Sequence, residues 1–231
     1  MQGLNSPKII LALDVHTIEE ARGFVDSLYP KINIFKVGSQ LFTAYGPKVI
    51  ELLHKKGAQV FLDLKYFDIP NTVAAAVAAA VRLKVKMLTL HISGGEEMLR
   101  AAVASAKQQA RISKINRPLL IGVTVLTSAN THKKRVFDLA ETGINCGLDG
   151  VVCSVKEAAI LRREIKKDFF IVTPGIRANN SIPDDQKRVA TVKQAVEAGS
   201  NFLVIGRPIL KAENPQAKAE ELLGDLSPLR R

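Results

Sequence analysis

The sequence has few of the residues that nucleic-acid-binding proteins use. It has no tryptophan, aromatic residues make up only 5% of the chain, and no run interleaves basic with aromatic side chains. Proteins that bind single-stranded nucleic acids rely on such stacking platforms. The net charge of +11 is therefore the only feature that favours nucleic-acid binding. A basic surface of this kind also attracts an anionic small substrate.

Membrane segments and the usual zinc or redox motifs are missing as well. The longest uniformly apolar run, 73–81, is too short to cross a bilayer. The first residues have no basic start followed by an apolar core, so we expect no signal peptide. Cys146 and Cys153 lack the Cys-x-x-Cys spacing of zinc and redox sites. These absences indicate a reduced, cytoplasmic protein that binds no membrane.

Strand-like apolar runs alternate with helical patterns over the 231 residues. Repeated strand-then-helix order implies a parallel sheet, and the even composition predicts one domain over residues 1–231. Eight such units fit a closed (β/α)8 TIM barrel. A doubly wound open sheet is the alternative, but its Gly-x-Gly-x-x-Gly turn is absent. The expected strands are 8–14, 32–38, 60–64, 87–91, 119–126, 150–154, 169–173 and 201–206, and the first six are followed by helices ending near residues 28, 56, 83, 110, 145 and 166.

One stretch, 61–72, carries an unusual density of charge at the end of a buried strand. Side chains on a strand alternate, so Asp63 and Lys65 are predicted to point to the same side. Burying such charges is costly unless they pair or serve a ligand. A structural ion pair with a solvated Asp68 is the simpler alternative for this motif taken alone.

The end of this stretch has the features of a helix start. Pro70 stops the strand, and Asn71 and Thr72 are good N-caps for an alanine-rich helix that we expect to open at Val73. The charges therefore lie where a strand gives way to the loop before a helix. Enzymes with α/β folds place their chemistry at this point.

Polar residues follow most of the other predicted strands too. In a barrel these positions surround one mouth, so residues far apart in the sequence converge there. Several ionisable groups around one ring favour an active site over a structural role. The residues at the strand exits are Asp14, Lys36, Asp63, Lys65, His91, Thr127, Gly206 and Arg207.

The exits of the last two strands predict an anion site. The segments 174–177 and 205–209 each place a glycine beside an arginine, Arg177 and Arg207. Phosphate sites of barrel enzymes are typically built from these loops, and a guanidinium matches phosphate oxygens. The connection 174–186 is long, which is typical of a functional lid.

With these residues assembled, the chain resembles the bacterial orotidine 5′-phosphate decarboxylase family over essentially its whole length. The motif Asp-x-Lys-x-x-Asp-Ile-Pro-Asn-Thr at 63–72 is highly specific, whereas Gly-Arg-Pro at 206–208 also occurs in related phosphate-binding barrels. The other segments that carry the resemblance are 11–14, 35–38, 123–128 and 173–177.

The resemblance implies a homodimer with shared active sites that converts orotidine 5′-monophosphate to uridine 5′-monophosphate without cofactor or metal. Asp14 would contact the ribose, Thr127 the pyrimidine, and Lys65 would donate the proton. The implied charge network is Lys36, Asp63, Lys65 and Asp68, with Asp68 and Thr72 reaching the partner's site. The implied phosphate ligands are Arg177, Gln186, Gly206 and Arg207.

The charged residues suit this chemistry. Loss of carbon dioxide from the ring leaves negative charge on one carbon, and cations positioned in advance stabilise it. Lys65 can stabilise that charge and then deliver a proton, while Asp63 repels the substrate carboxylate until carbon dioxide leaves.

Two other functions remain as alternatives at this stage. A magnesium-dependent sugar-phosphate decarboxylase or aldolase of the same superfamily also has Asp-x-Lys-x-x-Asp. Those relatives carry a glutamate metal ligand on the second strand, where this chain has Lys36. A basic nucleic-acid-binding barrel, suggested by the net charge alone, predicts tight and salt-sensitive binding.

Overall fold

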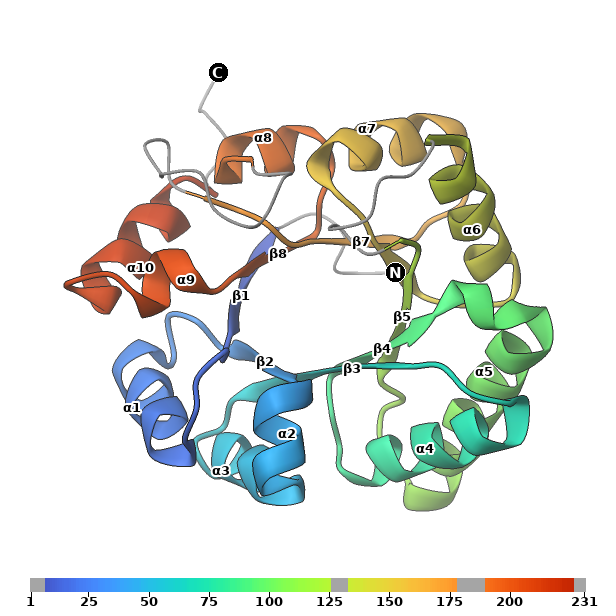
Figure 1. Cartoon of the computed structure of the whole chain (residues 1–231), viewed down its shortest axis with the longest axis horizontal. Helices are drawn as coiled ribbons and strands as arrows, with labels where there is room; N and C mark the ends of the chain where they lie inside the picture. The colour runs from blue at the N-terminus through green and yellow to red at the C-terminus, as the bar shows by residue number, and fades with distance from the viewer. Residues whose placement is uncertain (1–6, 126–132, 178–189, 227–231) are drawn as a thin grey trace.

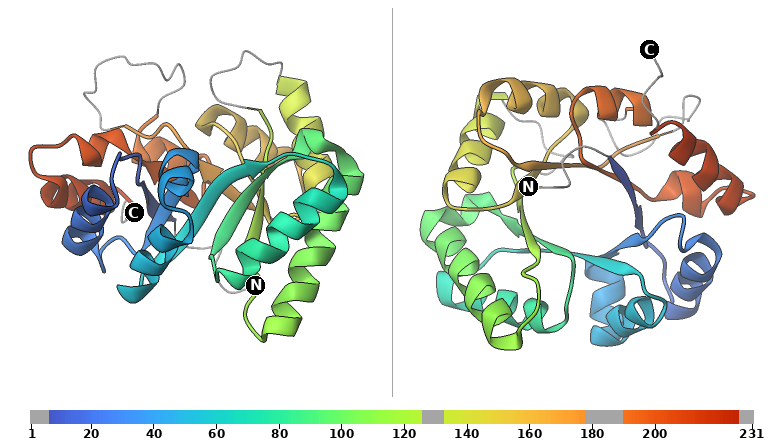
Figure 2. Two further views of the ribbon diagram at one scale, coloured as in Figure 1. Left: turned by 60° about the horizontal axis from the view of Figure 1, so that its bottom comes forward. Right: turned by 180° about the vertical axis from the view of Figure 1, so that it is seen from behind.

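The computed structural model describes residues 7–125, 133–177 and 190–226. Eight parallel strands close into a barrel in chain order, with β1 paired to β8, and this confirms the predicted (β/α)8 architecture (Figure 1). The helices surround the barrel on its outside (Figure 2). The strands are β1 (Lys8–Ala12), β2 (Ile34–Gly38), β3 (Gln59–Tyr66), β4 (Met87–His91), β5 (Leu119–Val123), β6 (Gly150–Val152), β7 (Phe170–Thr173) and β8 (Phe202–Ile205).

The helices occupy the connections between strands and follow the last one. They are α1 (Ile18–Leu28), α2 (Ser39–Tyr45), α3 (Pro47–Lys55), α4 (Pro70–Arg82), the short 3-10 helix η1 (Ile92–Gly94), α5 (Gly95–Ser113), α6 (Lys133–Asn145), α7 (Val155–Glu164), α8 (Val192–Glu197), α9 (Arg207–Leu210) and α10 (Pro215–Gly224).

Strand periodicity divides the core into two layers. Alternate strand residues form a small cluster inside the barrel, including Ile10, Ile34, Phe61 and Val204. Their neighbours along the strands pack outward against the helices in a much larger cluster. Because side chains alternate along a strand, the next inward-pointing positions are residues 14, 36, 63 and 206. The inner side chains at the carboxyl ends of β1, β2, β3 and β8 therefore continue directly into the barrel mouth.

The start of α4 differs from the prediction. The helix begins at Pro70 instead of Val73, and its N-cap is Ile69, so Asn71 and Thr72 are not the caps. Proline is well suited to the first helical turn because its φ is fixed near the helical value and its missing N–H would have no partner there. The short helix α2, which follows Gly38 directly, was not predicted either.

Strand β3 contains an irregularity that the periodicity did not predict. The pairing with β4 advances from Leu62↔Leu88 to Tyr66↔Leu90, so β3 uses more residues than β4 over this interval. Lys65 within this bulge has a φ of 52°, in the left-handed region that non-glycine residues seldom adopt. Bulges are common beside active sites, where they redirect side chains.

Gly150 provides a test of the barrel packing. A Cβ at this position would lie 2.4 Å from the carbonyl oxygen of Phe170 on the neighbouring strand, so backbone would have to move. We expect Gly150→Ala to cost roughly 1–3 kcal/mol, the usual range for overpacking. At about 2–4 °C per kcal/mol for a chain of this size, thermal unfolding should shift down by several degrees.

The matched control is Gly23→Ala on α1, where a Cβ meets nothing within 4 Å. Alanine is the better helix former, so this variant should be as stable as the parent or more stable. Equal Tm values for the two variants would show that β6 tolerates movement at Gly150.

Candidate active site

A pocket of about 510 Å³ opens at the carboxyl ends of the barrel strands. Its floor is formed by inward-facing apolar side chains of the barrel, and its walls carry most of the predicted ionisable residues. The charged residues that line it are Asp14, Lys36, Asp63, Lys65, Arg177, Arg207 and Lys211. The predicted convergence of distant strand exits on one mouth is therefore confirmed for these positions other than Lys211, which was not predicted.

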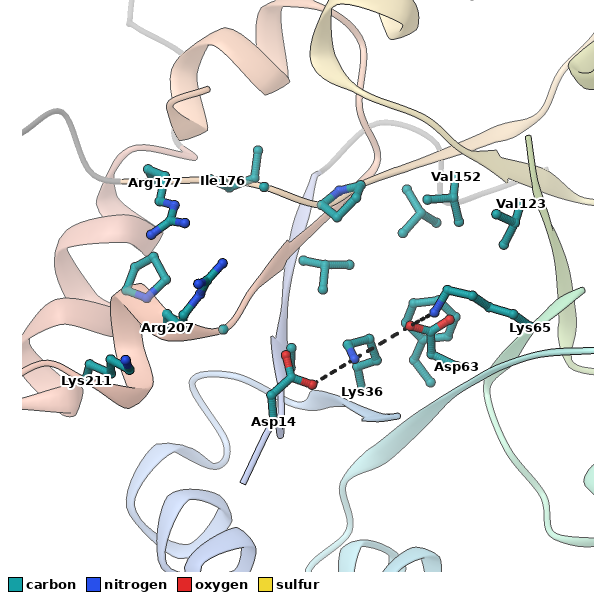
Figure 3. Close-up of a pocket in the computed structure, with 18 of the residues that line it drawn as sticks. Asp14, Lys36, Asp63, Lys65, Val123, Val152, Ile176, Arg177, Arg207 and Lys211 are labelled. Atoms are coloured by element: carbon teal, nitrogen blue, oxygen red, sulfur yellow. Dashed lines mark hydrogen bonds and ion pairs between the residues drawn. The ribbon is translucent and has the colours of Figure 1, made fainter. Parts of the chain in front are cut away.

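The acidic and basic side chains on one side of the pocket alternate in a continuous chain (Figure 3). Lys36 Nζ lies 3.1 Å from Asp14 Oδ1 and 3.6 Å from Asp63 Oδ2. Lys65 Nζ lies 2.9 Å from the same Asp63 oxygen. Lys36 and Asp63 are 12% and 13% exposed, whereas Asp14 is 57% and Lys65 37% exposed, so the two middle charges are the protected ones. Each charge is compensated by its neighbours.

Asp63 is held in its ionised form. Burial is the largest single influence and acts to raise the pKa of its carboxyl. The charges of Lys36 and Lys65 and the hydrogen bonds from Lys65 and Thr89 together outweigh it, so the pKa of Asp63 lies below its usual value. The pocket thus contains a fixed negative charge with a cation on each side.

Thr89 is a site residue that the sequence reasoning missed. Its hydroxyl donates to Asp63 Oδ1 at 2.9 Å and accepts the backbone N–H of Lys65 at 2.9 Å. Thr89 is buried in the middle of β4, opposite the bulge of β3, and so fixes both members of the Asp63–Lys65 pair. A polar residue within the apolar run 87–90 was the signal that could have identified it.

The opposite side of the pocket carries three cations. Arg177 follows β7, while Arg207 and Lys211 lie at the two ends of α9, directly after β8 (Figure 3). Gly206 lies beside the end of β1, where a Cβ would be 3.4 Å from both the Ala12 Cβ and Asp14 Oδ2, an ordinary van der Waals contact. Lys211 was not predicted, since it lies on a helix beyond the Gly-Arg motif.

Some predicted site residues lie elsewhere. Asp68 is exposed and does not line this pocket, and its Oδ1 accepts the N–H of Ile69 at 2.7 Å. Thr72 is exposed on the first turn of α4 and is also outside the pocket lining. His91 at the end of β4 is outside the pocket lining, and its ring centroid lies 5.6 Å from that of Phe67. Thr127 and Gln186 fall outside the described residues.

The described residues contain no candidate metal cluster and no helix that could span a membrane. Among residues 7–125, 133–177 and 190–226, no group of three or more His, Cys, Asp or Glu side chains is placed to hold a metal ion. None of the helices in those ranges is long and apolar enough to cross a membrane.

Fold and pocket together define a (β/α)8 barrel with a charged pocket at the carboxyl ends of its strands. One side of the pocket carries the alternating charge chain, and the other carries a basic wall formed by Arg177, Arg207 and Lys211. Residues 7–222 match the sequence model of the orotidine 5′-phosphate decarboxylase / HUMPS family, and the chain belongs to this family.

Proteins that are similar to this chain over all or nearly all of their length have names that agree with this assignment. The orotidine 5′-phosphate decarboxylase of Vibrio cholerae serotype O1 is 44% identical over 234 residues, covering 96% of this chain and 100% of that protein. The one from Coxiella burnetii is 44% identical over 231 residues, covering 95% and 97%. The crystal structure of orotidine 5′-phosphate decarboxylase from Lactobacillus acidophilus superposes with a TM-score of 0.84 at 34% identity, covering 97% of this chain and all of that one.

Thr89→Val tests how the ionised Asp63 is maintained. The substitution removes a hydrogen bond to the carboxylate with little change in volume, so the pKa of Asp63 should rise. The lowered pKa of Asp63 contributes stability that is present above its unfolded-state value and lost as pH falls through the folded value. In the variant this contribution should therefore be smaller, and its loss on acidification should be complete at a higher pH. Carboxyl carbon chemical shifts followed by NMR during acid titration measure the change.

The control is Thr43→Val on the exposed face of α2, which makes no contact with the site. An unchanged Asp63 titration in Thr89→Val would mean that the two lysines alone determine its ionisation.

Proposed function

We propose that this chain decarboxylates orotidine 5′-monophosphate to uridine 5′-monophosphate. The observation that carries the proposal is one pocket with the alternating chain Asp14–Lys36–Asp63–Lys65 on one side and Arg177, Arg207 and Lys211 on the other. The volume of about 510 Å³ suits a nucleoside monophosphate. The names of the 44% identical relatives support the same reaction.

In the proposed reaction the charge chain acts on the pyrimidine ring. The bond between the ring and its carboxylate breaks, carbon dioxide leaves, and the electron pair remains on the ring carbon. The Lys65 ammonium stabilises this charge and then transfers a proton to the carbon. Asp63, 2.9 Å from Lys65 Nζ, orients the lysine and repels the substrate carboxylate. Thr89 acts as a positioning residue because it contacts Asp63 and the Lys65 backbone.

The basic wall is assigned to the phosphate. Arg207 at the start of α9 and Arg177 after β7 provide planar donors that match phosphate oxygens, and Lys211 adds a third positive charge. The phosphate lies away from the reacting carbon, so its binding energy can be used to hold the ring against the charge chain. Two contacts predicted from the sequence belong to the same proposal. Gln186 would bind the phosphate, and Thr127 would contact the pyrimidine.

A metal-dependent sugar-phosphate reaction is less well supported. The Lys36 ammonium lies between the carboxylates of Asp14 and Asp63, and a cation at this point opposes the approach of a divalent metal ion. Turnover of orotidine 5′-monophosphate should therefore be unchanged in excess chelator. A sugar-phosphate enzyme that needs magnesium would lose its activity under that condition.

Lys65→Ala tests the proposed chemistry directly. Loss of orotate-ring absorbance should be observed with the parent protein, and the variant should be slower by on the order of 10⁴-fold, because both charge stabilisation and proton transfer are lost. Lys156→Ala, an exposed position on α7, is the control and should retain parental turnover. Near-parental turnover by Lys65→Ala would remove this lysine from the mechanism.

We also propose that two chains share their active sites, with Asp68 and Thr72 completing the partner's pocket. Asp68 is exposed, is not part of its own pocket lining and lies between Phe67 and Ile69, which are 61% and 67% exposed. Large apolar side chains exposed beside a functional motif are typical of a protein interface. A two-fold dimer would make the contribution of Asp68 reciprocal.

Mixing two inactive variants tests this arrangement. In a dimer that pairs Lys65→Ala with Asp68→Ala, shared sites would leave one site with both lesions and the other with neither. With random exchange of equal amounts, activity per chain should recover to roughly a quarter of the parental value. If Asp68 serves its own chain, every site keeps one lesion and no activity returns. Mass tagging of one variant verifies exchange independently of activity.

A further inference from the structure

A second large hollow lies at the opposite end of the barrel from the candidate active site. It has a volume of about 730 Å³ and is formed by segments that follow α3, α4 and α5 and lead into β3, β4 and β5. Those segments lie at the amino-terminal ends of the strands. Helices α4 and α5 pack side by side (Figure 1). Residues at their C-terminal ends line the hollow. Its ionisable residues are His54, Lys84, Lys86, Arg111, Lys114 and Arg117, and we call it the basic hollow.

The basic hollow contains no carboxylate among its lining residues. Arg117 is paired with Asp149, at 2.8 and 2.6 Å. Within the ranges that the structure describes, the side chains of the other four lysines and arginines form neither an ion pair nor a hydrogen bond with other protein side chains. Four exposed cations around one hollow repel each other unless an anion binds between them.

The backbone at two of these lysines is unusual. Lys84 and Lys114 have φ values of 57° and 53° just beyond the ends of α4 and α5. This left-handed position favours glycine, and the chain has glycine there after α3, α6 and α8, at Gly57, Gly147 and Gly199. Of the three helix ends that border the basic hollow, those of α4 and α5 have lysine at this position, whereas that of α3 has Gly57.

The helix macrodipole explains only part of this charge. A cation at a helix C-terminus is favourable, which accounts for one positive group each on α4 and α5. Lys86 and Arg117 instead precede strands β4 and β5, where no helix end requires them. The charges also act across the hollow, because burial and then the charge of Lys84 lower the pKa of His54, which comes from α3.

We infer that the basic hollow binds a small polyphosphate anion of the nucleoside triphosphate class through its phosphate groups. Several separated cations match a ligand whose negative charge is distributed over several groups, and the volume lies in the usual range for small-molecule sites. No Phe, Tyr or Trp lines the hollow, so it lacks the large aromatic platform on which a base usually stacks. Affinity should therefore follow the number of phosphates and depend little on the base. This inference is independent of the proposed decarboxylation.

The test is isothermal titration calorimetry with inorganic tripolyphosphate, ATP, GTP and AMP. Tripolyphosphate, ATP and GTP should bind with similar affinity, AMP should bind much more weakly, and added salt should weaken all of them. The double variant Lys84→Gly with Lys114→Gly removes two charges while keeping a residue that suits the left-handed backbone. Each charge close to an anion is worth about a factor of five in water, so affinity for ATP should fall by about 25-fold.

The thermal unfolding midpoint of this double variant should stay close to that of the parent. Should it fall, Lys86→Gln, in which no left-handed residue changes, provides the second measurement with an expected loss of about fivefold. The matched control is Lys134→Gln with Lys156→Gln, two exposed lysines on α6 and α7 that carry the same total charge but lie outside the hollow. This control should bind ATP as the parent does.

Three results would overturn the inference. Equal losses in the control and in the double variant would mean that the general surface charge attracts the anion. Loss in Arg207→Ala, with the double variant unaffected, would place the polyphosphate in the candidate active site. Tighter binding of a single-stranded oligonucleotide that carries the same charge as ATP, lost in the double variant, would identify a nucleic-acid surface.

Discussion

The Asp63 carboxylate, largely buried between two lysines, is the constraint on which the candidate site depends. It is 13% exposed, and a charge at that depth is tolerated only when compensated on every side. Lys36 from β2, Lys65 from β3 and Thr89 from β4 provide that compensation. Removal of the carboxylate would leave two ammonium groups facing each other in a partly desolvated pocket. The same interaction therefore holds three neighbouring strands in register and holds both lysines in place.

The bulge in β3 shows how the strand accommodates this arrangement. A regular strand would place residue 65 on the inner face two positions beyond residue 63, with an extended backbone. Here Lys65 adopts a left-handed φ of 52° and the pairing with β4 shifts, while Thr89 bonds to both the backbone and the acid. Backbone strain of this kind is found where surrounding contacts determine the conformation, commonly at functional sites. Lys65 is thus positioned by the sheet as well as by its ion pair.

Sequence periodicity predicted the barrel and much of the pocket, because both follow from local rules. Strand alternation and the shared direction of parallel strands bring Asp14, Lys36 and Asp63 to one mouth whatever the details of packing. The rest depends on pairing between strands. The β3 bulge and the contacts of Thr89 with Asp63 and Lys65 result from the register of β3 against β4. The sequence of either strand alone does not determine that register. Predicted caps at Asn71 and Thr72 were wrong because Pro70 begins α4 itself, and whether Asp68 serves a neighbouring chain stays a prediction.

The pairing of β1 with β8 has a consequence for protein synthesis. Asp14 emerges from the ribosome long before Arg207, yet the two line one pocket. Until β8 is available, β1 has an unpaired edge, which makes a nascent chain prone to association. The basic wall is equally incomplete at that stage. A ribosome that stalls before β8 therefore releases a polypeptide in which the candidate active site lacks one of its walls.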